Sequence, residues 1–150
     1  MAEANSEVVP NERPNVGLEA ELFCGTETIL LVEDEAGVRE LAREYLEMSG
    51  YTVIVAPDGN TAIELAAKRA GTIHLLMTDM VMPGIGGREL AERVLAVRPG
   101  IKILYMSGYT DQAVVHQGIL GTDAPLLQKP FTLSTLTIKL REILAPEVVR

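Results

Sequence analysis

Short apolar runs recur along the chain from residue 28 onward, and each is nearly continuous in hydrophobic character. Such runs are typical of parallel strands covered on both faces, because neither face then has to present polar side chains to water. The pattern predicts five strands, at Ile29–Val32, Tyr51–Val55, Ile73–Met77, Ile101–Met106 and Leu126–Gln128.

Helical periodicity lies between these runs. The first helix carries a stripe with i, i+3, i+4, i+7 spacing, formed by Val38, Leu41, Ala42 and Tyr45 and closed by Gly50. Four more helices are expected: Ala62–Ala70, opened by Asp58 and ended by Gly71; Glu89–Val97, stopped by Pro99 and Gly100; Asp111–Gly118; and a last helix from a Thr132 cap through Leu144, stopped by Pro146.

Five strand–helix units in succession predict an open α/β sheet, because a closed barrel needs about eight such units. The fold class we predict is a flavodoxin-like, doubly wound, five-stranded parallel sheet of order 2-1-3-4-5, with five helices in a three-layer α/β/α arrangement. Functional groups in such sheets lie beyond the carboxyl ends of the strands, at the switch point of the topology.

The first 26 residues differ from the rest, since they are rich in Glu, Asn, Pro and Gly and show no helical or strand periodicity. We therefore expect a flexible tail or linker over residues 1–26, one domain over 27–146 and a short tail over 147–150.

Composition narrows the function classes. The net charge of −8, with only 13 Lys and Arg, argues against direct nucleic-acid binding. The sequence has no apolar run long enough for a membrane span and no signal-peptide pattern. The single cysteine, Cys24, excludes an internal disulfide and fits a cytoplasmic protein. Two histidines and one cysteine are too few for a common zinc site, so any metal should be a hard cation bound by carboxylates.

Polar side chains follow four of the predicted strands: Glu33, Asp34 and Glu35 after the first, Asp79 after the third, Ser107 after the fourth and Lys129 after the fifth. Singly, each has an ordinary explanation, since acids cap helices, serines occupy turns and lysines lie on surfaces. Together they place carboxylates, a hydroxyl and an ammonium group at one edge of the sheet.

Electrostatics indicates what this cluster binds. Two carboxylates about 5 Å apart repel by roughly 3 kcal/mol at an effective dielectric constant near 20. Lys129 supplies one positive charge against three carboxylates, and Mg²⁺ would compensate the remainder. The metal would then favour transfer of a phosphoryl group onto Asp79, while Lys129 and Ser107 contact phosphoryl oxygens.

Four segments, LLVEDE, MTDMVMPGIGG, YMSGY and LQKPF, resemble in order and spacing the signatures of response-regulator receiver domains. The resemblance covers roughly residues 28–145. It implies that Asp79 is the phosphoacceptor and that Glu33 and Asp34 form the acidic pair. It also implies an Mg²⁺ site formed by Glu33, Asp34, Asp79 and the Val81 backbone carbonyl, with Asp34 as a direct ligand. Ser107 would be the switch hydroxyl, Lys129 the phosphate-pairing lysine, and the bond before Pro130 a cis peptide.

More narrowly, the segment from Pro99 to Leu120 together with LLQKPF resembles the receivers at the C-terminal ends of hybrid sensor histidine kinases. The expected partner is a histidine kinase or a histidine phosphotransfer domain. A homodimer through the fourth and fifth helices is a further expectation from the family.

Three positions depart from the family pattern or modulate it. Leu126 stands three residues before the lysine, where many members carry an aromatic residue that follows phosphorylation. Val81 and Tyr109 stand at positions that influence how water reaches the phosphoryl group, and they predict a long-lived adduct.

Two other functions remain open on the sequence alone. An Mg²⁺-dependent phosphatase or phosphotransferase would also use an aspartyl-phosphate, but such enzymes often carry an acid where this chain has Val81, and they need a cap domain. A phosphorylation-independent interaction domain would lack the acceptor or the lysine, and both are present. The leading prediction is a phosphoacceptor signalling domain that is not itself an enzyme.

Overall fold

The computed structural model describes residues 25–108 and 125–144. Its centre is a parallel sheet of order β2-β1-β3-β4-β5, as the sequence predicts. The strands are β1 (Thr28–Val32), β2 (Thr52–Ala56), β3 (Leu75–Asp79), β4 (Lys102–Ser107) and β5 (Leu126–Gln128).

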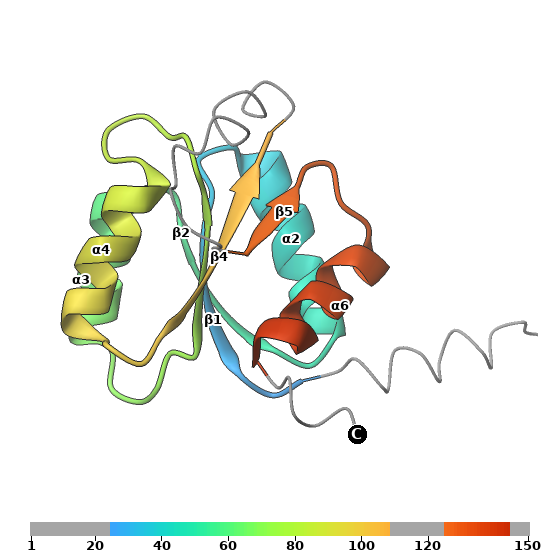
Figure 1. Cartoon of the computed structure of the whole chain (residues 1–150), viewed down its shortest axis with the longest axis horizontal. Helices are drawn as coiled ribbons and strands as arrows, with labels where there is room; N and C mark the ends of the chain where they lie inside the picture. The colour runs from blue at the N-terminus through green and yellow to red at the C-terminus, as the bar shows by residue number, and fades with distance from the viewer. Residues whose placement is uncertain (1–24, 109–124, 145–150) are drawn as a thin grey trace, which may run out of the picture.

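Helices cover both faces of the sheet, in three layers (Figure 1). One face carries α2 (Ala36–Met48) and α6 (Leu133–Leu144), and the other carries α3 (Gly59–Lys68) and α4 (Gly87–Val97). Four of the five predicted helices are therefore confirmed. The predicted helix Asp111–Gly118 lies outside the described residues, as does the predicted tail up to residue 24.

The ends of the helices follow from local chemistry. The Asp58 carboxylate accepts the Thr61 N–H at 2.8 Å, and the Thr132 hydroxyl accepts the Thr135 N–H at 3.1 Å, so both predicted caps are confirmed. Gly50 follows α2 with φ at 98°, a left-handed conformation that glycine adopts without a steric penalty.

The sheet separates two hydrophobic clusters. Leu30, Val32 and Leu76 face α3 and α4, whereas Ile29, Leu31 and Met77 face α2 and α6. Every side chain of β3 is buried, which explains the continuous apolar run in the sequence. The predicted stripe on α2 is partly wrong: Ala42 and Leu46 form its buried centre, while Leu41 is 44% exposed.

Several predicted strand boundaries need correction. β2, β3 and β4 each begin and end later than predicted, and β3 and β4 continue through Asp79 and Ser107, which we expected just beyond the strands. Main-chain pairing causes the difference: Asp79 pairs with Met106, and the Met80 N–H donates to the Met106 carbonyl at 2.9 Å. Asp79 and Ser107 are therefore anchored by the sheet itself.

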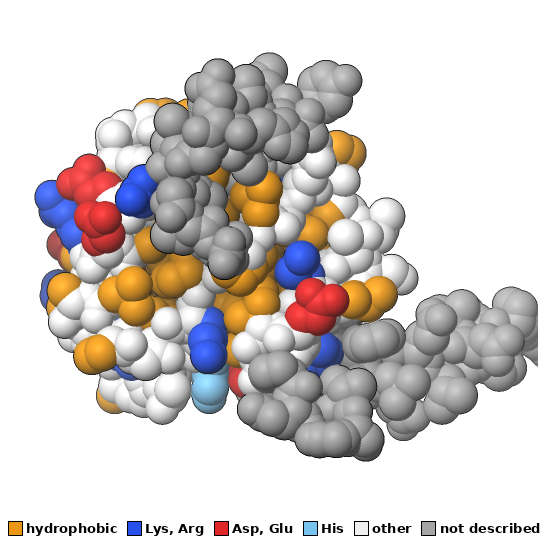
Figure 2. Space-filling view, in the orientation of Figure 1, with side chains coloured by type: hydrophobic (Ala, Val, Ile, Leu, Met, Phe, Trp, Pro, Cys, Tyr) orange, Lys and Arg blue, Asp and Glu red, His pale blue; other side chains and the backbone are white. Residues whose placement is uncertain are grey.

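The described surface shows mixed charge. On the face in Figure 2, acidic and basic side chains lie side by side over α4, where Arg93 pairs with Glu89 at 2.9 Å. Among the described helices, none is both long and apolar enough to cross a membrane.

Candidate phosphoryl-transfer site

The candidate site lies at the carboxyl ends of β1 and β3. These strands are neighbours in the sheet, although the chain visits β2 between them, so their carboxyl ends form the switch point of the topology. Val32 pairs with Thr78 in the register of the two strands. Glu33 and Asp79 each follow one of these paired residues, so they lie side by side at the strand ends.

Three carboxylates meet there, as the sequence predicts. Ligand oxygens of Glu33, Asp34 and Asp79 all lie within 4.8 Å of one another. Glu33 is fully buried and Asp79 is 3% exposed, whereas Asp34 faces solvent. The cluster thus has two buried acids and one acid at its opening.

Lys129 brings a positive charge to the two buried acids. Its Nζ lies 2.7 Å from Asp79 Oδ1 and 3.3 Å from Glu33 Oε1. Burial alone would lower the pKa of Lys129, but its contacts with the Asp79 and Glu33 carboxyl groups raise that pKa above its ordinary value. The ammonium group therefore stays charged.

One cation does not compensate this cluster. Burial, together with the neighbouring Glu33 carboxyl, raises the pKa of Asp79 from 3.8 to about 8, and Lys129 opposes this shift only in part. Asp79 Oδ1 is buried and lies 2.7 Å from Lys129 Nζ, a distance that makes an ion pair. Within the described residues, however, no donor reaches this oxygen with good hydrogen-bond geometry. A buried, incompletely satisfied carboxylate oxygen beside two further carboxylates suits a hard divalent cation.

Two contacts that no sequence pattern predicts hold the acidic turn after β1. The Arg39 guanidinium, on α2, donates to the Glu33 carbonyl oxygen at 2.7 Å. The Glu33 side chain accepts the Glu35 N–H at 3.2 Å. Glu35 itself stands at the start of α2 and makes no capping hydrogen bond through its side chain. No spacing rule links an arginine to a carbonyl six residues earlier, so only the fold identifies Arg39.

The remaining predicted site residues lie around this centre. Ser107 is 1% exposed, and its hydroxyl donates to the Gly108 carbonyl at 3.3 Å. Val81 follows Asp79 closely and is 56% exposed. The Lys129–Pro130 peptide bond is cis. Leu126 is half-buried against the cluster that faces α3 and α4. Tyr109 lies outside the described residues.

Gly87 is a further residue that sequence reasoning missed. A Cβ at this position would collide with the Asp79 carbonyl oxygen, and the Gly87 N–H donates to the Met80 carbonyl at 2.9 Å. Helix α4 can therefore begin directly against the backbone of Asp79 only because residue 87 has no side chain.

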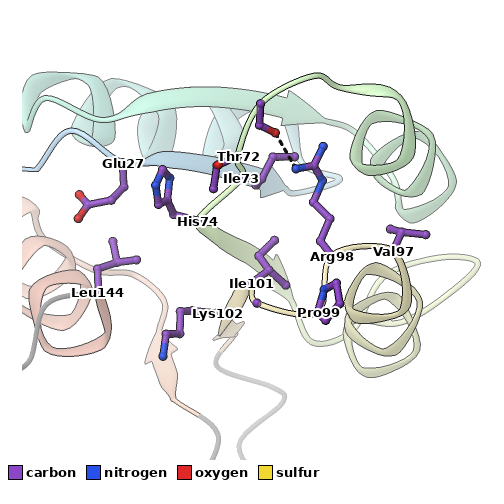
Figure 3. Close-up of a pocket in the computed structure, with 12 residues that line it drawn as sticks. Glu27, Thr72, Ile73, His74, Val97, Arg98, Pro99, Ile101, Lys102 and Leu144 are labelled. Carbon is purple, nitrogen blue, oxygen red and sulfur yellow. Dashed lines mark hydrogen bonds between the residues drawn. The ribbon is translucent and has the colours of Figure 1, made fainter.

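A pocket of about 410 Å³ lies elsewhere, lined by residues that precede β1, β3 and β4 and by the ends of α4 and α6 (Figure 3). Its main polar groups already have partners. Arg98 donates to three carbonyls, of Ala66, Arg69 and Gly71, while Glu27 pairs with Arg141. His74 Nδ1 accepts the Thr28 N–H at 3.0 Å, so this side chain links the start of β1 to the residue before β3. The acidic cluster, not this pocket, holds the candidate chemistry.

Comparison with known proteins agrees with this geometry. Residues 29–141 match the family described as Response regulator receiver domain. The sensor kinase CckA of Brucella abortus is 34% identical over 122 residues, which cover 81% of this chain and 13% of that protein. The receiver protein CpdR of the same species is 34% identical over 116 residues, 77% of this chain and 95% of CpdR. The crystal structure of the receiver domain from the hybrid histidine kinase CckA is 33% identical, with a TM-score of 0.64, over 77% of this chain and 96% of that one.

Proposed function

The chain belongs to the response regulator receiver family of two-component signalling, and from this membership we propose that Asp79 is its phosphoacceptor. The observation that carries the proposal is the contact of Asp79 with both Lys129 and the acidic pair, at the switch point of the sheet. A buried carboxylate with these neighbours is suited to act as an oxygen nucleophile once a cation offsets the local charge.

The proposed reaction is transfer from a phosphohistidine of a histidine kinase or phosphotransfer domain. An Asp79 carboxylate oxygen forms a bond to phosphorus as the phosphorus–nitrogen bond breaks, and the imidazole nitrogen keeps the electron pair. Lys129 supports the transferred group by pairing with one of its oxygens, and the Ser107 hydroxyl can donate to another. The phosphorylated Asp79 would then alter a surface that other proteins recognise.

Mg²⁺ is the proposed cofactor. Glu33, Asp34, Asp79 and the Val81 carbonyl are the groups that would hold it, either directly or through water. When bound, it would neutralise charge on the incoming phosphoryl group. The exposed position of Asp34 leaves the cluster open on the side from which an ion and a phosphate donor can enter.

The relatives suggest two alternative kinds of protein to which this chain could belong. The chain spans 13% of the CckA sensor kinase but nearly the whole of CpdR. We therefore propose either the receiver part of a hybrid histidine kinase or a stand-alone response regulator, with the domain proper over residues 27–146. A cytoplasmic location and a homodimer through the fourth and fifth predicted helices remain predictions.

Intact-mass measurement tests the proposal. The chain is incubated with Mg²⁺ and acetyl phosphate, and one phosphoryl group should add to the wild type. Asp79→Asn, which keeps the shape but removes the nucleophilic oxygen, should gain none. Glu142→Gln is the control, since Glu142 is an exposed carboxylate near the end of α6 that pairs with Lys139. Undiminished phosphorylation of Asp79→Asn would place the acceptor elsewhere.

A further inference from the structure

We propose that Ile85, seated over Gly59, positions the segment Met80–Gly86 that follows the phosphoacceptor. This inference rests on the proposed function, because the same segment contains Val81, whose carbonyl is a proposed Mg²⁺ ligand. It assigns a role in the site to Ile85 and Gly59, neither of which carries a chemical group that sequence motifs would single out.

The contact is a close fit between a side chain and a helix start. Gly59 is the first residue of α3 and is buried. A Cβ built on Gly59 would overlap the Ile85 side chain, with Cδ1 only 2.6 Å away. Cβ atoms essentially never come this close to another heavy atom, so Ile85 occupies the space that any larger residue at position 59 would need. Gly59 therefore forms a seat for Ile85.

The rest of the segment shows why such a seat is needed. Its first part is anchored by Met80 and Met82, each 7% exposed in the core, and its end by the Gly87 N–H bond to the Met80 carbonyl. Between these anchors the chain passes through Pro83 and Gly84, both exposed, and Gly84 has φ at 82°. Ile85 is the side chain of this exposed arc that packs into the cluster facing α3 and α4.

The consequence is a mechanical link between α3 and the site. Displacing Ile85 would move the arc between Met82 and Gly87. Because Met82 joins this arc directly to Val81, a shift of the arc would pull on Met82 and so displace the Val81 backbone. A metal ligand supplied by backbone has no side-chain torsions with which to compensate, so its position depends on the loop that carries it. Ile85 and Gly59 are positioning residues in this sense, and they touch no reacting atom.

Gly59→Ala tests the link by filling the seat. Because alanine favours helix more than glycine does, the variant should fold, yet its Mg²⁺ dissociation constant should rise about tenfold. Gly37→Ala is the matched control: Gly37 also lies in the first turn of a helix, but a Cβ there meets nothing within 4 Å. Its Mg²⁺ affinity should equal that of the wild type. Calorimetric titration with Mg²⁺ alone measures both.

Two further measurements show whether the contact itself is responsible. Ile85→Ala removes the side chain that a Cβ at position 59 would meet. The double variant Gly59→Ala with Ile85→Ala should therefore bind Mg²⁺ with the same affinity as Ile85→Ala alone. If the two substitutions instead weaken Mg²⁺ binding independently, so that their fold-changes multiply, the inference is overturned. In the metal-free chain, Gly59→Ala should speed hydrogen exchange at the Gly87 amide, and an unchanged rate would overturn it as well. A wild type that binds no Mg²⁺ while the Gly87 amide still responds would count against the proposed cofactor, not against the seat.

Discussion

Lys129 and Asp79 form a nearly buried ion pair, with Nζ 2.7 Å from Oδ1 and side-chain exposures of 18% and 5%. The same ammonium lies 3.3 Å from Glu33 Oε1, so one cation serves two buried carboxylates. Breaking a buried pair by removing one partner is costly, since the other charge is then left without compensation. This arrangement gives Lys129 a structural role in addition to its proposed contact with the phosphoryl group.

Replacing Lys129 with alanine should therefore destabilise the metal-free chain. We expect a loss of about 3 kcal/mol near pH 9, where Asp79 would be ionised, and a smaller loss near pH 6, where Asp79 holds its proton. Lys139→Ala is the control, because Lys139 makes only a 3.8 Å contact with the exposed Glu142, a kind of pair worth about 0.5 kcal/mol. Urea unfolding at both pH values measures the difference, and equal losses in the two variants would contradict the expectation.

Mg²⁺ should stabilise the chain, and the effect should depend on Asp34. Ligand linkage gives about 2.7 kcal/mol at a hundredfold excess over the dissociation constant. Asp34→Ala removes a ligand from the open side of the cluster and should abolish most of the shift in melting temperature. Glu35→Ala is the matched control, since Glu35 is also exposed and adjacent but lies outside the carboxylate cluster. Shifts of the same size in wild type and Asp34→Ala would rule out this ligand set.

The sheet and the acidic site were predictable because both follow from strand order. Continuous apolar runs such as Leu75–Met77, alternating with helical patterns, are typical of parallel strands covered on both faces, and parallel strands bring their carboxyl ends to one edge. Glu33, Asp79 and Lys129 were therefore expected together before any distance was known. Strand ends were less predictable, since pairing of Asp79 with Met106 extends β3 beyond its apolar run.

Contacts between backbone and side chain could not be predicted in this way. Arg39 reaches the Glu33 carbonyl, and Ile85 packs on Gly59, through geometry that no hydrophobic period encodes. Leu41 was wrongly assigned to the buried face of α2 for a related reason. An i, i+3, i+4 stripe fits two neighbouring faces of a helix equally well, and only the observed burial of Ala42 and Leu46 shows which face packs on the sheet.

Stability without Mg²⁺ should fall as the pH rises through neutrality. The folded-state pKa of Asp79 is raised to about 8 from 3.8, chiefly by burial and by Glu33. Between these values the folded chain binds a proton that the unfolded chain has lost, so rising pH favours unfolding until Asp79 is ionised in both states. Asp79→Asn has no such proton and should lose this slope. The test is the denaturant midpoint of wild type and of Asp79→Asn, measured between about pH 6 and pH 9. If both midpoints change with pH to the same extent, another group is responsible for the pH dependence.

Arg98 should be a major stabilising residue of the α3 and α4 layer. Its guanidinium donates to the Gly71 carbonyl at 2.7 Å (Figure 3), and also to the Ala66 carbonyl at 2.8 Å and to the Arg69 carbonyl. It therefore satisfies backbone acceptors in the last turn of α3 and just after it. Arg98→Ala should cost about 2 kcal/mol in the free energy of unfolding. Arg93→Ala, which breaks an exposed pair with Glu89, should cost about 0.5 kcal/mol or less. A small loss for Arg98→Ala would mean that water replaces the three bonds.

The phosphoryl group on Asp79 should be long-lived, and Val81 should be one cause. Hydrolysis requires a water molecule placed in line behind the phosphorus, and a polar side chain near the site helps to hold it. Val81 is 56% exposed two residues after the acceptor, so its side chain stands at the open edge of the site yet offers no hydrogen bond. Val81→Asn should therefore speed phosphate loss, by roughly tenfold if it acts as one weak general-base or positioning group. Tyr109→Ala, at the other position implied by the family, should speed it as well.

Val97→Asn provides the control for this experiment. Val97 is also an exposed valine, at 48%, but it lies at the end of α4, beside the pocket away from the acidic cluster. The same change in polarity there should leave the decay of the adduct unaltered. Phosphate release is followed after the donor has been removed, with Mg²⁺ held constant, so that only hydrolysis is observed. If Val81→Asn decays at the wild-type rate or more slowly, the valine does not limit access of water. In that case the lifetime would be set by Tyr109 or by the proposed phosphate-contacting groups Lys129 and Ser107, which would fix how far the phosphorus is exposed.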